Sequence, residues 1–260
     1  MSLGQALLLG IVQGLTEFLP VSSSGHLVLT EHLLGIPAGD LSFEVAVHFG
    51  TLVAVCLYFR ARLWDMARSL FGWQGAGLSA REGQRLLALI IVGSIPAGVI
   101  GLLFKDEIES LFADAHLAAA FLIVTGLLLL AMRLRQKPDG EITWPRAFLI
   151  GVAQAVAILP GISRSGSTIA TGSLSGVKPA TAAEYSFLLS VPAVFGATLL
   201  ALPDAIAEGT FGLSHILGAL AAAIVGYLAL KWVFVSIRQG RFTLFGIYCI
   251  IAGVIGVILI

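Results

Sequence analysis

The stretch Gln13-Gly-Leu-Thr-Glu17-Phe-Leu-Pro-Val-Ser22-Ser-Ser-Gly-His26 places ionisable and hydroxyl side chains inside an otherwise apolar segment. A second stretch of this kind, Pro160-Gly-Ile-Ser163-Arg164-Ser-Gly166-Ser-Thr, occurs in the second half of the chain. Ionisable side chains are costly at membrane depth, and they are usually retained only where they face one another or a water-filled cavity. In a chain this hydrophobic, the two stretches therefore predict one composite polar site.

The composition is that of a polytopic membrane protein. Of the 260 residues, 58% are hydrophobic and only 12% are charged, whereas soluble domains have about 25% charged residues. Six apolar runs approach or exceed the roughly 20 residues that a spanning helix needs. They lie at about 41–59, 85–104, 117–135, 183–203, 215–235 and 243–260. The basic residues are scattered over short loops and form no stripe, so we do not expect nucleic-acid binding.

Two further segments, 3–34 and 147–178, are apolar but interrupted at their centres by Pro, Gly and Ser. Each therefore predicts two short helices around a polar turn. An irregular turn at membrane depth is tolerated where it is buried in protein or lines a cavity. We interpret both segments as re-entrant helical hairpins.

The two hairpins are also repeats of one another. Aligning Gln13 with Gln154 also aligns Ser22-Ser-Ser-Gly25 with Ser163-Arg-Ser-Gly166. The chain is thus expected to be one all-α membrane domain, 1–260, with repeats at about 1–135 and 147–260. Each repeat has a hairpin and three spans, and the odd number of spans inverts the second repeat. Inverted repeats with broken helices are an established way to build a polar site near the midplane.

Charged residues in the loops predict the orientation of the chain, because cytoplasmic loops carry an excess of Lys and Arg. The first, third and fifth loops between spans are basic and are placed in the cytoplasm. The second and fourth are acidic, which leaves both termini outside. The basic set is Arg60, Arg62, Arg68, Arg81, Arg85, Arg133, Arg135, Lys137, Arg146, Lys231, Arg238 and Arg241, and the acidic set is Asp106, Glu107, Glu109, Asp114, Asp204 and Glu208.

The first polar stretch has the chemistry of a phosphate and metal site. Gln13 and Glu17 are four residues apart and share one face of a helix, where they offer oxygen ligands to Mg²⁺, which needs only one or two protein carboxylates. The turn Ser22-Ser23-Ser24-Gly25 provides hydroxyls and successive backbone N–H groups that can bind an anion. A serine here could attack phosphorus or simply hold an oxygen, and His26 could serve as acid, base or hydrogen-bond donor.

The second stretch contributes a positive charge, which the first stretch lacks. Arg164 is the only arginine in its apolar neighbourhood, and its planar guanidinium suits phosphate oxygens. At this depth it needs an anion, which either Glu17 or a substrate phosphate could supply. Glu44 and Glu184, which occupy nearly equivalent positions in the two repeats, are weaker candidates that could equally cap helices or lie near a hairpin edge.

Together these motifs resemble those of the bacterial undecaprenyl-diphosphate phosphatases of the bacitracin-resistance type. The resemblance runs essentially from end to end. It is carried by Glu17-Phe-Leu-Pro-Val-Ser-Ser-Ser-Gly-His26 and by Pro160-Gly-Ile-Ser-Arg-Ser-Gly-Ser-Thr168. Phe43-Glu44 and Glu184-Tyr-Ser-Phe-Leu-Leu-Ser-Val-Pro192 also match.

The resemblance implies an enzyme of the bacterial plasma membrane that depends on Mg²⁺ or Ca²⁺ and opens to the extracytoplasmic side. It would remove the terminal phosphate of undecaprenyl diphosphate, return the lipid carrier to peptidoglycan synthesis and confer bacitracin resistance. The implied partners are that substrate and membrane lipid, with a second copy of the chain in a homodimer as a further candidate.

The resemblance also assigns roles to residues of this chain. The catalytic positions are Glu17, Ser23, His26 and Arg164, the phosphate-binding positions are Ser22, Ser24, Gly25, Ser163, Ser165 and Gly166, and the metal ligands are Glu17 and Gln13. Many members have a glutamate in place of Gln13. Because an amide cannot act as a base, Glu17 is the one carboxylate of this motif, and either Glu17 or His26 would accept the proton of the candidate nucleophile Ser23.

Two questions stay open at this point. The sequence does not separate attack by Ser23 from direct attack by water with Ser23 as a phosphate ligand. Inverted repeats with broken helices are also transporter architecture, so a transporter that flips the lipid phosphate is the alternative function. A purely structural membrane subunit would leave Glu17 and Arg164 unexplained.

Overall fold

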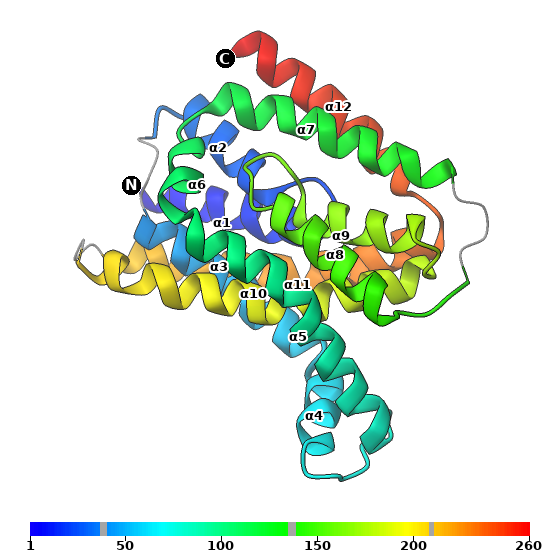
Figure 1. The fold of residues 1–260 in the computed structure, drawn as a ribbon. Coiled ribbons are helices and arrows are strands. Elements are labelled where there is room, and N and C mark those ends of the chain that lie inside the picture. Colours follow the sequence, from blue (N-terminus) through cyan, green and yellow to red (C-terminus); the bar gives the residue numbers. More distant parts are fainter. Residues whose placement is uncertain (37–40, 135–138, 208–210) are drawn as a thin grey trace.

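The computed structural model describes residues 1–36, 41–134, 139–207 and 211–260, and their regular structure is helical (Figure 1). Arg135, Lys137 and Glu208 of the predicted loop charges lie outside these residues. The helices are α1 Leu3–Phe18, α2 Ser23–Leu33, α3 Leu41–Tyr58, α4 Arg60–Ser69, α5 Ala80–Leu103, α6 Lys105–Leu111, α7 Ala115–Ala131, η1 Met132–Leu134, α8 Trp144–Val156, α9 Arg164–Leu174, α10 Pro179–Ala207, α11 Leu213–Arg238 and α12 Phe242–Leu259.

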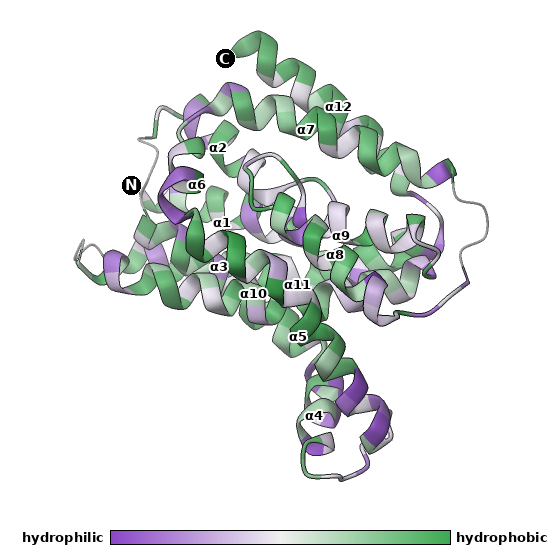
Figure 2. Cartoon of the chain, viewed as in Figure 1, coloured by the Kyte–Doolittle hydropathy of each residue, from purple (hydrophilic) through white to green (hydrophobic). Residues whose placement is uncertain are grey.

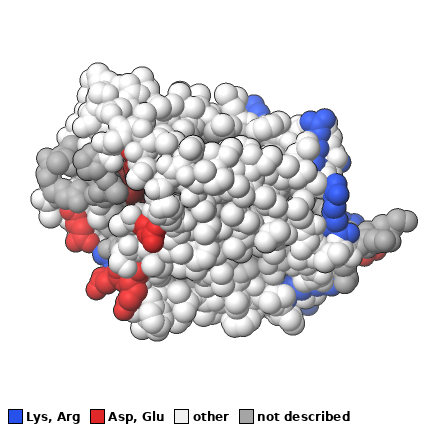
Figure 3. All heavy atoms as spheres, turned by 90° about the horizontal axis from the view of Figure 1, so that it is seen from above, with Lys and Arg blue, Asp and Glu red and all other residues white. Residues whose placement is uncertain are grey.

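The prediction of an all-α protein with six spans is confirmed. Among the described residues, six helical segments are long and apolar enough to cross a membrane, namely α3, α5, α7 with η1, α10, α11 and α12. Their exposed surface is rich in large apolar side chains, and Figure 2 shows the hydrophobic colour along these helices. Acidic and basic side chains gather at opposite ends of the molecule in Figure 3, as expected for charged loops on the two sides of a bilayer.

Two helices were not anticipated, α4 and α6, and both lie in segments predicted as loops. α4 and the start of α5 project from the body (Figure 1), and they are among its most hydrophilic parts (Figure 2). The buried carboxylate of Asp65 fixes the connection between them by accepting N–H bonds from Ala76 at 3.1 Å and Gly77 at 2.8 Å. These helices are too short and too polar to be recognised as spans.

Each interrupted segment forms two helices joined by a turn, as predicted. In the first hairpin α1 ends at Phe18, and Ser22 caps α2 by accepting the Gly25 N–H at 3.3 Å. In the second, Ser163 caps α9 by accepting the Gly166 N–H at 3.0 Å. Equivalent serines thus start equivalent helices, because a serine side chain satisfies an N–H that the first helical turn leaves free.

The two hairpins meet tip to tip. The hydroxyl of Ser165 donates to the Leu19 carbonyl at 3.0 Å, and a Cβ added to Gly25 would lie 2.9 Å from the Gly161 Cα. This contact fits hairpins that enter from opposite sides of a bilayer. That they are re-entrant stays a prediction.

The long helix of each hairpin packs on a span from the opposite half of the chain. α1 lies against α11 and α8 against α5, while α3 packs on α10 and α7 on α12. Glycines allow the first two contacts: a Cβ on Gly10 would lie 2.4 Å from the Gly218 carbonyl oxygen, and one on Gly151 would lie 2.3 Å from that of Gly93. Gly10 and Gly151 occupy equivalent positions of the predicted repeats. In each hairpin, this glycine allows the close contact with the neighbouring span. Small residues let membrane helices approach closely in this way.

This packing predicts that Gly151→Ala destabilises the protein by about 1–3 kcal/mol, because its methyl group would overlap the α5 backbone. We would compare thermal unfolding midpoints in detergent. Gly98→Ala is the matched control, since a Cβ at Gly98 meets nothing within 4 Å. An equal response of the two variants would contradict the proposed close contact.

Candidate active site

Glu17 lies at the centre of the polar groups that the two hairpins bring together. Its Oε2 accepts hydrogen bonds from Ser23 Oγ at 2.6 Å and from Gln13 Nε2 at 3.1 Å. Its Oε1 accepts from an Nη atom of Arg164 at 2.5 Å. A carboxylate from one hairpin is thus paired with the guanidinium of the other, and Glu17 is one of the two anions that the sequence offered for Arg164.

Arg164 retains one donor that could bind an anion. Its side chain is 16% exposed and that of Glu17 is 7% exposed, so both charges are largely removed from water. The second Nη atom of Arg164 is buried and has no hydrogen-bond partner among the described residues. An unsatisfied buried donor is unfavourable, and a phosphate oxygen would satisfy it while Glu17 stays bound.

The turn before α2 holds its residues in an unusual conformation. Ser22 has φ of +67°, in the left-handed region that side chains seldom adopt. Strained backbone of this kind is found at functional sites. Ser22 itself is buried and occupied as the helix cap, whereas Ser23 and Ser24 are partly exposed. Ser23 is therefore the serine that both reaches Glu17 and remains accessible.

His26 is not brought to the carboxylate. Its Nδ1 lies 2.8 Å from the Ser22 carbonyl oxygen, and its Nε2 lies 2.7 Å from the hydroxyl of Tyr248 in α12, against which its ring is stacked. The imidazole thus supports the turn and faces α12. Of the two proton acceptors considered for Ser23, the geometry favours Glu17.

The serines of the second hairpin mainly hold its turn. Ser163 caps α9, its N–H donates to Thr125 of α7 at 2.9 Å, and Ser165 is bonded to Leu19. Ser163 and Ser165 are each 1% exposed, and Gly166 is also buried. Their assignment as phosphate-binding residues stays a prediction, since direct contact would require these bonds to be given up.

The donors available to a metal ion are oxygens. Gln13 Oε1 is buried and has no hydrogen-bond partner among the described residues, and it lies in the same cluster as the Glu17 carboxylate and the Ser23 hydroxyl. This set suits Mg²⁺ or Ca²⁺, which prefer oxygen ligands. No group of three or more His, Cys, Asp or Glu that could hold a metal occurs within the described ranges.

Tyr248 and Thr125 contact predicted site residues but were not identified from the sequence. Both lie within apolar spans, 243–260 and 117–135, where a single hydroxyl gives no signal above the hydrophobic pattern. Of the weaker candidates, Glu184 pairs with Arg62 of α4 at 2.7 Å, with both side chains about one third exposed.

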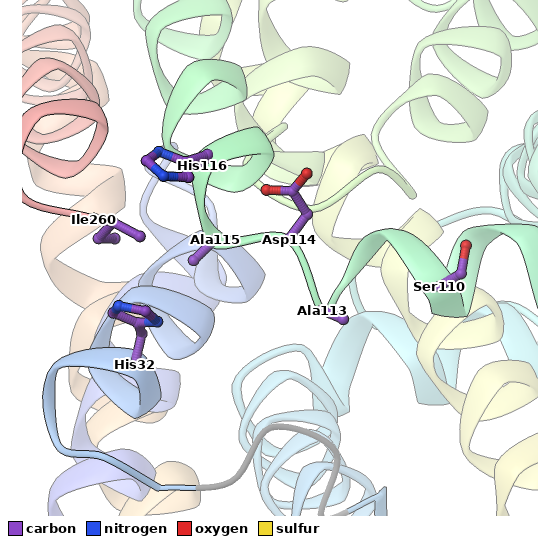
Figure 4. A pocket seen from close by; sticks show the side chains of 7 residues that line it. All are labelled: His32, Ser110, Ala113, Asp114, Ala115, His116 and Ile260. Carbon is purple, nitrogen blue, oxygen red and sulfur yellow. The ribbon is translucent and has the colours of Figure 1, made fainter.

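A pocket of 370 Å³ opens near the C-terminal end of α12, between α2 and the start of α7 (Figure 4). Its lining includes His32, Asp114 and His116 but none of the predicted site residues.

Comparisons with known proteins match the chain over nearly its full length. A family model described as "Bacitracin resistance protein BacA" matches residues 6–255. The chain is similar to the "Undecaprenyl-diphosphatase" of Desulforapulum autotrophicum, with 47% identity over 99% of this chain and 98% of the relative. It is also similar to the "Undecaprenyl-diphosphatase" of Halothermothrix orenii, with 44% identity over 100% and 98%, and to the "Undecaprenyl-diphosphatase 1" of Bacillus licheniformis, with 40% identity over 95% and 94%.

The buried ion pair predicts a specific pattern of stability. Arg164→Gln leaves the Glu17 charge without its partner and should destabilise the protein by about 3–5 kcal/mol. The double variant Glu17→Gln, Arg164→Gln removes both charges and should recover part of this loss. Unfolding midpoints of the wild type, both single variants and the double variant form the required cycle. Additive losses would show that the pair is not coupled.

Proposed function

The chain belongs to the bacitracin resistance protein BacA family, and from this membership and its site we propose that it hydrolyses undecaprenyl diphosphate to undecaprenyl phosphate and inorganic phosphate. The observation that carries the proposal is the contact of Ser23 and Arg164 with opposite oxygens of Glu17, at the junction of the two hairpins. The hydroxyl of Ser23, the carboxylate of Glu17 and the guanidinium of Arg164 would serve as nucleophile, base and cation, and their contacts support this proposal. Its product would re-enter peptidoglycan synthesis, which accounts for bacitracin resistance.

In the proposed reaction, Ser23 Oγ attacks the terminal phosphorus while Glu17 accepts its proton across the 2.6 Å hydrogen bond. The P–O bond to the bridging oxygen breaks, and undecaprenyl phosphate leaves. Water then attacks the phosphoserine, releasing inorganic phosphate and restoring the Ser23 hydroxyl. The competing route is direct attack by water that Glu17 deprotonates, with Ser23 as a phosphate ligand.

Arg164 would stabilise the charge that develops on the transferred phosphoryl group. Positioning and charge stabilisation supply most of the catalysis in phosphoryl transfer, and the unpartnered Nη donor of Arg164 is available for this purpose. A divalent cation held by Glu17 and Gln13 would neutralise further negative charge of the diphosphate. His26, bonded to Tyr248, would keep the serine turn in place.

We propose that the protein lies in the bacterial plasma membrane with its site open to the extracytoplasmic side. The separation of acidic and basic side chains in Figure 3 supports this orientation. The basic α4 segment would then be cytoplasmic, and the acidic α6 segment would face outward. A homodimer remains a candidate assembly.

Phosphate release from farnesyl or undecaprenyl diphosphate, measured on protein purified in detergent, tests the activity. Glu17→Gln, Ser23→Ala and Arg164→Ala should each lower kcat by about 10²-fold or more, and EDTA should abolish release until Mg²⁺ or Ca²⁺ is returned. Ser69→Ala is the control, because that buried serine bonds within α4. A well-folded wild type without activity would favour lipid-phosphate transport, for which the Ser23 hydroxyl is dispensable.

Labelling with a membrane-impermeant thiol reagent tests the orientation. In intact cells, and in a background with Cys56 and Cys249 replaced by Ala, Ser110→Cys on α6 should be labelled. Gln74→Cys, in the exposed connection after α4, should react only after lysis. The reverse pattern would invert the proposed topology.

A further inference from the structure

An apolar groove of about 600 Å³ lies between α5 and α8. Every side chain that lines it is hydrophobic. The lining comes from the second half of α5 (Ile95, Pro96, Val99, Ile100), from Ile108 of α6, from α8 (Phe148, Val152, Ala155, Val156) and from the turn after α8 (Ile158, Leu159).

The groove exists because α8 is too short to cover α5. The two helices touch where Gly93 meets Gly151, and α8 ends soon after that contact, at Val156, whereas α5 continues to Leu103. Beyond the contact the side chains of Ile95, Val99 and Val152 are 39–51% exposed. Correspondingly, α5 is the least buried of the six spans, at 22% of its most apolar window.

One lining residue of the groove, Leu159, lies in the connection between α8 and α9, and α9 begins with Arg164 of the candidate active site. Because only four residues separate Leu159 from Arg164, their Cα atoms are at most about 18 Å apart. Turn hydrogen bonds from Ile158, Leu159 and Ile162 to carbonyls of the preceding turn keep this connection compact. The hydrocarbon chain of a substrate whose phosphate lies at Arg164 could therefore reach Leu159 and the groove that it lines.

We propose that this groove binds the polyprenyl chain of the diphosphate substrate, an inference that rests on the proposed function. None of the described lining residues has a polar side chain, so the groove suits a pure hydrocarbon. Its volume falls in the range of typical small-molecule pockets, roughly 300–1000 Å³. A second copy of the chain would instead need a broad surface of about 800 Å² on each partner.

Substitutions that fill the groove test the proposal. Val152→Trp and Val99→Trp should each lower kcat/KM for farnesyl diphosphate by about tenfold, while leaving isopentenyl diphosphate, whose single isoprene unit is too short to run along the groove, unchanged. The control is Val254→Trp, on the exposed face of α12 (42% exposed).

Equal activity of the filled variants and the control on farnesyl diphosphate would overturn the proposal and leave bulk lipid or a second protein copy as the occupant. Equal losses on both substrates would also overturn it, because they would indicate damage to the phosphate site. A farnesyl diphosphate analogue with a photoreactive tail gives a readout independent of hydrolysis. Crosslinks at residues 95–100 or 148–159 would support the groove even if the proposed activity fails, and crosslinks elsewhere would refute it.

Discussion

The ion pair between Glu17 and Arg164 is the interaction on which the rest of the structure depends. Two charges that are at most 16% exposed must satisfy each other, because an unpaired charge is strongly unfavourable at this depth. They can meet only if the tips of the two hairpins touch, which in turn requires close helix contacts at Gly10 and Gly151. The ion pair, the broken helices and the glycine-lined contacts thus form one connected arrangement. The pair leaves one guanidinium nitrogen without a partner among the described residues. That nitrogen can donate a hydrogen bond to a phosphate oxygen.

The two hairpins, which are predicted repeats, contribute unequally to the site. Ser22 and Ser163 cap equivalent helices in the same way, yet Glu17 corresponds to Ile158, and Ser23 corresponds to Arg164. The first hairpin therefore provides the carboxylate and the serine hydroxyl, and the second provides the cation. Gln154 shows the same asymmetry. Its equivalent, Gln13, bonds to Glu17, but both amide atoms of Gln154 lack a partner in the described part of the chain, because its own hairpin has no acid one turn later.

Features with a strong local pattern could be predicted from the sequence. The six spans follow from hydropathy, and the hairpins follow from Pro, Gly and Ser inside apolar runs. The need of Arg164 for an anion, either Glu17 or a substrate phosphate, follows from the cost of isolated charge. The family membership, first inferred from two motifs, is confirmed by full-length matches. Features that depend on three-dimensional packing could not be predicted. α4 and α6 are too polar to give a span signal, Tyr248 is a single hydroxyl in an apolar helix, and the direction in which His26 points depends on the position of α12.

The exchange of packing between repeats has a consequence for how the chain is made. α1 packs on α11, and Glu17 pairs with an arginine far along the chain, so the first hairpin leaves the ribosome long before its partners exist. Until α9 and α11 have been synthesised, its carboxylate and serines have no stable place in the hydrocarbon region. The first hairpin must therefore stay at the membrane surface or in the insertion machinery until then. The ion pair between Glu17 and Arg164 can form only after most of the protein has been translated.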